Sequence, residues 1–276
     1  MNASLNPLAA GARRITAGVA GGLACLYVLA CATLFVAQRG LIFPRPPPTP
    51  VQVQGATLLT LPRSDAPPAW ALWLPPPEGA PVVVLFHGNA EDLAGVGDLV
   101  HAFAAAGLGV LVVEFPGYGP AYAESPSEDG CYAAAEAALV YLQHDLGVPA
   151  DRTVLVGRSL GSGVAAEMAA RRHGARLVLV SPYTSIPDVG ARLFPWLPVR
   201  LLARDRFATA AKATQLRLPT LVVHGTADRV IPYEMGVAVS HRIVGARLVT
   251  VPDGDHDGSW LRPSVWAEIV AFALGM

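Results

Sequence analysis

Six short apolar runs between residues 82 and 251 each have the length and composition of a buried strand. They cover residues 82–86, 110–115, 153–157, 177–181, 220–224 and 247–251. Stretches with helical patterning lie at residues 93–106, 127–146, 161–172, 233–243 and 263–274. Because uniformly apolar strands are typical of parallel sheets covered by helices on both faces, the alternation predicts an α/β fold with a mainly parallel sheet. Two earlier runs, at residues 56–61 and 69–74, predict an antiparallel edge.

Polar or glycine-rich motifs follow five of these six runs. They are HGNAED (87–92), PGYG (116–119), GRSLGSG around Ser159, GTADRVIP with Asp228, and PDGDHDG with His256. The carboxyl ends of parallel strands meet at one edge of a sheet, and ligands of open α/β sheets bind there. The sequence therefore predicts a single site at this edge, built from loops far apart in the chain.

Ser159 lies in the pattern Gly-x-Ser-x-Gly, with Gly157 and Gly161 on either side. This pattern is typical of a sharp strand-to-helix turn that exposes a serine hydroxyl. A serine hydroxyl is a poor nucleophile at neutral pH and needs a neighbouring base, for which an imidazole is suited. A carboxylate behind the imidazole fixes its tautomer. Ser159, Asp228 and His256 supply these three groups, in that chain order.

Taken together, the motifs FHGNAED, FPGYG, GRSLGSG, SPYTS, HGTADRVIP and GDHDG resemble those of the α/β-hydrolase superfamily. Within it the chain resembles the membrane-anchored serine hydrolases, a branch that includes eukaryotic protein-depalmitoylating enzymes and many bacterial members. The resemblance implies an α/β-hydrolase fold and an oxyanion hole formed by the backbone N–H groups of Leu160 and Asn89. It also implies that Asp228, rather than Asp253, Asp255 or Asp257, is the acid of the triad. The His-Gly-Gly-Gly loop of many lipases is missing, so bulky tertiary-alcohol esters are not expected substrates.

Other polar residues at the predicted edge have simpler interpretations. His87, His224 and Glu114 are expected to shape loops. The sequence does not assign a role to Arg158, for which a bond to a neighbouring carboxylate is one interpretation. The histidines lack the spacing of metal ligands, and the glycine loops lack the Gly-Lys-Ser/Thr ending of phosphate-binding loops. We therefore expect neither a metal nor a cofactor.

Residues 15–37 carry no charge and are long enough to span a bilayer as a helix. The predicted organisation is a short N-terminal segment (1–14), a transmembrane anchor (15–38), a Pro-rich linker (39–55) that spaces the domain from the membrane, and a catalytic domain (56–276). Arg13 and Arg14 favour a cytoplasmic N-terminus and an exported catalytic domain. Ala30-Cys31-Ala32 leaves a cleaved signal peptide as an alternative, and Val28–Cys31 leaves a lipoprotein box.

The interval between Ser181 and Leu218, about 36 residues, is too short for a separate cap domain. Its apolar side chains, Phe194, Trp196, Leu197 and Leu201, either pack on the domain or line an apolar acyl pocket. The principal prediction is a membrane-anchored serine hydrolase that cleaves carboxylic esters or thioesters, including acylated or lipid-like substrates. A serine amidase or peptidase and a non-catalytic, membrane-tethered binding protein are the alternatives. The net charge of −1 and the lack of a basic cluster argue against nucleic acid as a partner, and the oligomeric state stays open.

Overall fold

The computed structural model describes residues 7–63 and 66–276. In this part of the chain, eight strands form one sheet in the order β1-β2-β4-β3-β5-β6-β7-β8. Their bounds are β1 Thr57–Leu61, β2 Ala69–Leu74, β3 Val82–Phe86, β4 Gly109–Val113, β5 Thr153–Arg158, β6 Arg176–Val180, β7 Thr220–Gly225 and β8 Arg247–Val251. Strands β3 to β8 are parallel, and β1 and β2 form the antiparallel edge. The predicted fold class is thus confirmed.

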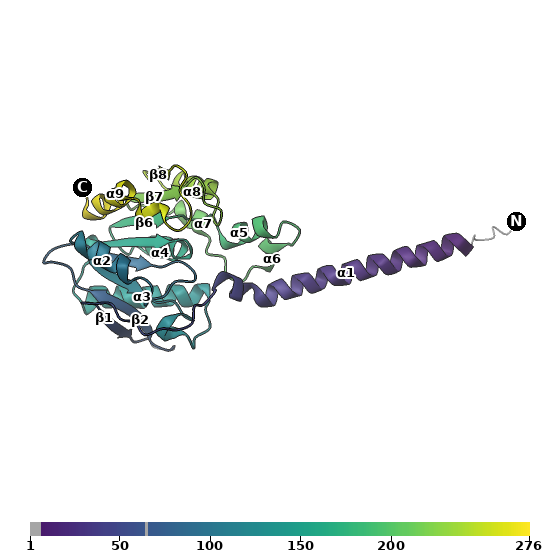
Figure 1. Ribbon diagram of the computed structural model, residues 1–276, viewed down its shortest axis with the longest axis horizontal. Coiled ribbons are helices and arrows are strands. Elements are labelled where there is room, and N and C mark those ends of the chain that lie inside the picture. The colour runs from purple at the N-terminus through teal and green to yellow at the C-terminus, as the bar shows by residue number, and fades with distance from the viewer. Residues whose placement is uncertain (1–6, 64–65) are drawn as a thin grey trace.

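Helices cover both faces of this sheet (Figure 1). Their bounds are α2 Gly97–Ala105, α3 Glu128–His144, α4 Leu160–Ala170, α5 Ile186–Leu193, α6 Val199–Leu202, α7 Thr209–Ala213, α8 Tyr233–Ser240 and α9 Pro263–Leu274, with single 3-10 turns at Gly119–Ala121, Ala150–Arg152 and Ser259–Leu261. Along β3, Val82, Val84 and Phe86 pack in the core beneath α3, α4, α7 and α8, whereas Val83 and Leu85 pack beneath α2 and α9. This alternation explains the continuous apolar runs, because both faces of each central strand are buried.

Two of the predicted element bounds differ from the structure for reasons that the local hydrogen bonds explain. The helix expected from residue 93 begins at Gly97, because the Asp92 carboxylate accepts hydrogen bonds from the N–H groups of Ala94 and Gly95 and holds a turn instead. Strand β4 ends at Val113 rather than at residue 115. There the side chain of Glu114 turns inward and accepts the N–H of Phe115.

The N-terminal helix α1 (Pro7–Ile42) is longer than the predicted anchor at both ends. Its stretch Thr16–Ile42 contains an 18-residue window with a mean hydropathy of 2.2, and the stretch is long and apolar enough to cross a membrane. A signal sequence near an N-terminus meets the same criteria. Figure 1 shows α1 projecting from the domain, with α5 and α6 beside its C-terminal end. Apolar side chains such as Leu23 and Val28 are therefore exposed.

Residues 39–55, expected to form a linker that spaces the domain from the membrane, begin inside α1 and pack on the domain at both ends. Residues 39–42 continue α1, and Phe43 is only 1% exposed. Its ring lies 6.2 Å from that of Phe207, and Val53 packs beneath α2. Apolar side chains at both ends of the segment thus fasten it to the domain, and residues 44–50, where its prolines lie, are free of helix and strand as expected.

Candidate active site

The turn between β5 and α4 holds Ser159 in a strained conformation. Ser159 has a φ of +48°, which is uncommon outside glycine, and Leu160 already begins α4. A Cβ at Gly161 would collide with the backbone carbonyl of Phe86, and one at Gly157 with that of Gly161. The two glycines of the motif are therefore required by close backbone packing around the serine.

Three loops bring Ser159, His256 and Asp228 together in a line. Nε2 of His256 lies 3.0 Å from Oγ of Ser159, and its Nδ1 lies 2.7 Å from Oδ2 of Asp228. All three residues are buried, with exposures of 5% to 8%. The loops follow β5, β7 and β8, so the structure assembles at one sheet edge the three residues that the sequence singles out.

The carboxylate of Asp228 is held in its ionised form. Burial by itself raises the pKa of this carboxyl, but hydrogen bonds from His224, His256 and the N–H of Ile231 outweigh burial and lower the pKa below its ordinary value. Oδ1 accepts the N–H groups of Val230 and Ile231 at 2.9 and 2.8 Å, which leaves Oδ2 for the imidazole. A carboxylate at Nδ1 keeps the proton there, so Nε2 presents its lone pair to the serine hydroxyl.

His224 is expected from the sequence only to shape a loop, but in the structure it also contacts the carboxylate of Asp228. Its Nε2–H donates to the carbonyl of Ile231 at 2.9 Å, and the same atom lies 3.3 Å from Oδ2 of Asp228. The ring is buried against Gly236, where a Cβ would overlap Nδ1. The signal in the sequence is its place at a strand end four residues before Asp228.

Two of the three acids near His256 in the sequence have other partners for their carboxylates. Asp255 accepts the N–H groups of Gly258 and Ser259, and Asp257 pairs with Arg158 at 2.8 Å. The backbone N–H of Asp253 donates to the hydroxyl of Thr226. Within the described chain, the carboxylate hydrogen-bonded to His256 is that of Asp228.

Two backbone N–H groups beside Ser159 are candidates for an oxyanion hole. Leu160 is the first residue of α4, and N–H groups in the first turn of a helix have no partner within the helix. Asn89, in the loop after β3, lines the same cavity as Ser159 and Leu160. The neighbouring N–H of Gly88 donates to Glu91 at 2.6 Å, which fixes the shape of this loop.

Arg158 joins the two loops that flank Ser159. Its guanidinium pairs with Glu91 in the loop after β3 and with Asp257 next to His256. The carboxylate that the sequence leaves unspecified is therefore two carboxylates, one on each side of the site. The Arg158 side chain is 10% exposed, and its Nε has no partner among the described residues.

A buried pair supports the loop after β3 from below. Nε2 of His87 lies 2.9 Å from Oε1 of Glu114, whose carboxylate also accepts the N–H groups of Leu93 and Phe115. Burial by itself lowers the pKa of His87, but the hydrogen bond and charge of Glu114 outweigh it and raise the pKa above 6.5. This geometry matches the loop-shaping role expected for both residues.

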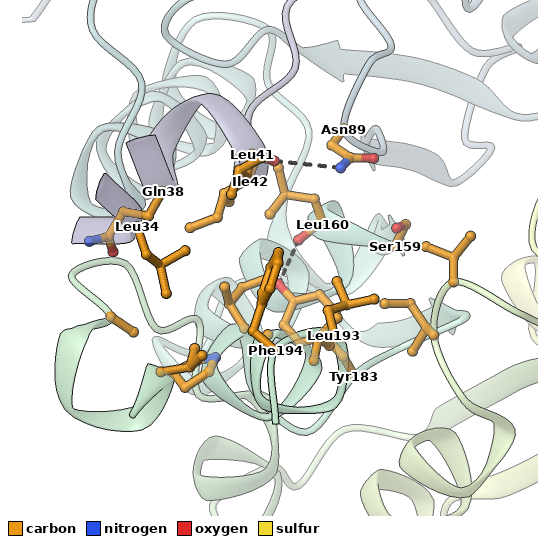
Figure 2. Close-up of a pocket in the computed structure, with 18 of the residues that line it drawn as sticks. Leu34, Gln38, Leu41, Ile42, Asn89, Ser159, Leu160, Tyr183, Leu193 and Phe194 are labelled. Atoms are coloured by element: carbon orange, nitrogen blue, oxygen red, sulfur yellow. Dashed lines mark hydrogen bonds between the residues drawn. The ribbon is translucent and has the colours of Figure 1, made fainter. Parts of the chain in front are cut away.

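A cavity of about 370 Å³ opens beside Ser159 (Figure 2), within the usual range of ligand pockets of roughly 300–1,000 Å³. Its walls come from the end of α1 and from the cap segment, residues 186–202, which comprises α5, α6 and the loop between them. Phe194 lines this cavity, whereas Leu201 is 86% exposed. Among the described lining residues Arg229 is the one charged side chain, and none is acidic.

The described residues contain no group of three His, Cys, Asp or Glu side chains placed to hold a metal ion.

Comparison with known proteins identifies relatives. The family described as "Serine aminopeptidase, S33" matches residues 77–210, and "TAP-like protein" matches residues 203–272. An uncharacterized protein of Mycobacterium tuberculosis is 37% identical over 182 residues, 64% of this chain and 63% of that protein. The α/β hydrolase domain-containing protein aho-3 of Caenorhabditis elegans is 32% identical over 186 residues, 66% of this chain and 54% of that protein. The match thus spans less than two thirds of either relative.

Solved structures share the fold at low sequence identity. An esterase of Pyrococcus furiosus superposes with a TM-score of 0.66 at 16% identity, covering 83% of this chain and 96% of that one. A puromycin-hydrolyzing peptidase of M. tuberculosis gives 0.65 at 20% identity, covering 80% of this chain and 39% of that one. The sheet order, the strained serine turn and these matches lead to one conclusion: the chain belongs to the α/β-hydrolase superfamily.

Proposed function

We propose that this protein is a membrane-anchored serine hydrolase that cleaves carboxylic esters or thioesters of apolar acyl groups through an acyl-enzyme on Ser159. The observation that carries the proposal is the hydrogen-bonded line from Ser159 through His256 to Asp228 at the edge of an apolar cavity. A line of this geometry activates a serine, and the cavity beside it accommodates an acyl chain.

In the proposed reaction, Oγ of Ser159 attacks the carbonyl carbon while Nε2 of His256 takes the hydroxyl proton. The negative oxygen of the tetrahedral intermediate accepts the N–H groups of Leu160 and Asn89. The C–O or C–S bond then breaks, and the imidazolium returns its proton to the leaving alcohol or thiol. A water molecule then attacks the acyl-enzyme in the same way: Nε2 of His256 takes its proton and returns it to Oγ of Ser159 as the carboxylic acid leaves. Asp228 stabilises the imidazolium during both acylation and deacylation.

A serine amidase or peptidase is the second candidate, because the family that matches residues 77–210 is described as a serine aminopeptidase. An enzyme that binds the free amine of a peptide commonly uses a carboxylate for it. The described lining of the cavity has no acidic side chain, and its one charged residue, Arg229, has the wrong sign. The cavity therefore favours an acyl group over an N-terminal amine.

The α1 helix is proposed to span the membrane, with the catalytic domain on the exported side. The support is the apolar stretch Thr16–Ile42, with Arg13 and Arg14 before it. Reporter fusions placed after Pro50 test this topology. Fusions that are active only in the cytoplasm would reverse it, and recovery of a mature chain beginning near Cys31 would replace the anchor by a cleaved or lipidated N-terminus.

The activity is tested with the full chain in detergent and an acyl group presented as an ester, a thioester and an anilide. Ser159→Ala is the control, because its smaller side chain keeps the fold and removes the nucleophile. We expect ester and thioester turnover that Ser159→Ala abolishes, and slow anilide turnover. Preferred anilide cleavage would select the amidase, and absence of turnover and of fluorophosphonate labelling in folded protein would select the binding protein.

A further inference from the structure

The C-terminal end of α1 is hydrogen-bonded to the cap segment and to the residues that follow it. Gln38, only 6% exposed, donates to the carbonyl of Leu202 at 3.1 Å and accepts the N–H of Arg204 at 2.8 Å. Arg39 pairs with Asp205 at 2.8 Å, where the carboxylate is 4% exposed. These contacts bury polar groups of the helix against residues more than 160 positions away.

This docking makes α1 a wall of the cavity that holds Ser159. Leu34, Gln38, Leu41 and Ile42 line it from one side, and Figure 2 shows them across from Leu193 and Phe194 of the cap segment, with Ser159 at one end. The helix also reaches the loop that carries a proposed oxyanion donor. The side-chain amide of Asn89 lies 3.5 Å from the carbonyl of Ile42.

A second apolar groove of about 440 Å³ adjoins this cavity. One face of α1 forms its floor, with Leu26, Ala30 and Leu34 at helical spacing, and Trp196 and Leu197 of the cap segment form the other side. Leu34, Leu41 and Phe194 line both spaces. The groove and the cavity therefore share a boundary of three apolar side chains.

The groove lies within the part of α1 that is apolar enough to span a bilayer. Its α1 residues fall between Leu26 and Leu41, inside the stretch Thr16–Ile42. Trp196 is 60% exposed at its rim, and tryptophan is enriched where proteins meet the membrane interface. If α1 spans the membrane, the groove opens toward the acyl chains of the lipids and the cavity lies at its inner end.

We infer that the groove is the route by which the acyl chain of a bilayer-resident lipid ester reaches Ser159. The chain lies between α1 and the cap segment and passes Leu34, Leu41 and Phe194, which places the ester carbon at the serine. The membrane helix is thus part of the substrate-binding site as well as an anchor. This inference rests on the proposed function, and it adds the substrate class and its direction of entry.

The test uses the full chain reconstituted in phosphatidylcholine vesicles and two fluorogenic substrates: a long-chain glycerolipid ester in the vesicles and a water-soluble acetyl ester. The readout is the ratio of long-chain to acetyl turnover. Leu34→Trp fills the boundary, and Ala30→Trp fills only the outer groove. Each should lower the ratio by about tenfold or more, since excluding two methylene groups from apolar contact corresponds to about that factor.

Val36→Trp is the matched control, because Val36 lies on the same helix, is 80% exposed and lines neither space. Its ratio should stay within about twofold of the wild type. A small fluorophosphonate reports whether Ser159 remains intact in each variant; if Leu34→Trp loses labelling, Ala30→Trp alone decides.

Two outcomes overturn the inference: an unchanged ratio in Ala30→Trp, or an equal fall in Val36→Trp. Failure of the proposed function looks different. In that case the wild type turns over neither ester, or Ser159→Ala matches it on both.

Discussion

Replacing Arg158 by methionine should impair both stability and turnover, although the side chain is not part of the proposed chemistry. The substitution removes two ion pairs, with Asp257 and with Glu91, that contribute differently to the free energy of unfolding. Asp257 is 84% exposed, so its pair contributes at most about 1 kcal/mol. Glu91 is 33% exposed and its partner 10%, so this charged hydrogen bond contributes about 1.5–3 kcal/mol. A loss of about 1.5–4 kcal/mol follows, or roughly 3–16 °C in the melting temperature of a domain of this size.

The effect on turnover follows from the second bond of Glu91. Its Oε2 accepts the N–H of Gly88, next to Asn89, so release of Glu91 loosens a proposed oxyanion donor. Complete loss of such a donor costs about 10²–10³-fold in kcat, and a displaced donor should cost about 10–100-fold. KM should change little, because the acyl cavity is not lined by Arg158.

Thermal unfolding and steady-state kinetics on a short water-soluble ester measure both effects. Arg158→Lys should recover part of the loss, because it keeps the charge but not the fork that reaches two carboxylates. Asp257→Asn should stay close to wild type, since it removes only the exposed pair. The reasoning is refuted if Arg158→Met keeps wild-type kcat, or if Asp257→Asn loses as much as Arg158→Met.

Three further expectations concern other parts of the site. Asp228→Asn should lower kcat by about 10⁴-fold through the wrong imidazole tautomer, and a loss below tenfold would assign the orienting role to another group. Glu114 raises the pKa of His87 above 6.5, so the pair stabilises the fold fully below about pH 6.5 and this contribution is lost as the pH rises through the folded-state value. Guanidinium unfolding across this range should show the decline, and Glu114→Gln should flatten it; a parallel decline in the variant would contradict the assignment. Gly161→Ala should destabilise the protein by about 1–3 kcal/mol through overpacking, whereas Gly95→Ala, whose added Cβ lies 3.6 Å from its nearest neighbour, should not; equal melting temperatures for the two would refute this.

The sequence predicts the sheet well because its information is local. Each central strand is buried on both faces, so its residues form an uninterrupted apolar run in the sequence. The residues that directly follow each run lie at the same edge of the sheet. Ser159, Asp228 and His256 could therefore be brought together without coordinates. The late start of α2 escaped prediction because the Asp92 side chain competes with the helix for backbone N–H groups.

Contacts between distant segments produce no comparable pattern in the local sequence. The docking of Gln38 and Arg39 on the chain around Leu202 and Asp205 depends on polar groups that look like ordinary flanks of an apolar helix. The burial of Phe43 also cannot be predicted from its position beside a proline-rich stretch. For this reason the sequence predicts the apolar helix but not that the end of this helix lines the pocket.

The central claim is that Ser159 forms a covalent acyl-enzyme, and intact-protein mass spectrometry tests it most directly. The full chain is mixed with a chromogenic ester, quenched in acid within the first turnovers and then digested to locate any adduct. The account predicts one acyl group per chain, on the peptide that contains Ser159, and none in Ser159→Ala. Folded wild-type protein that hydrolyses the ester without an adduct on Ser159, or that carries the same adduct in Ser159→Ala, would contradict it.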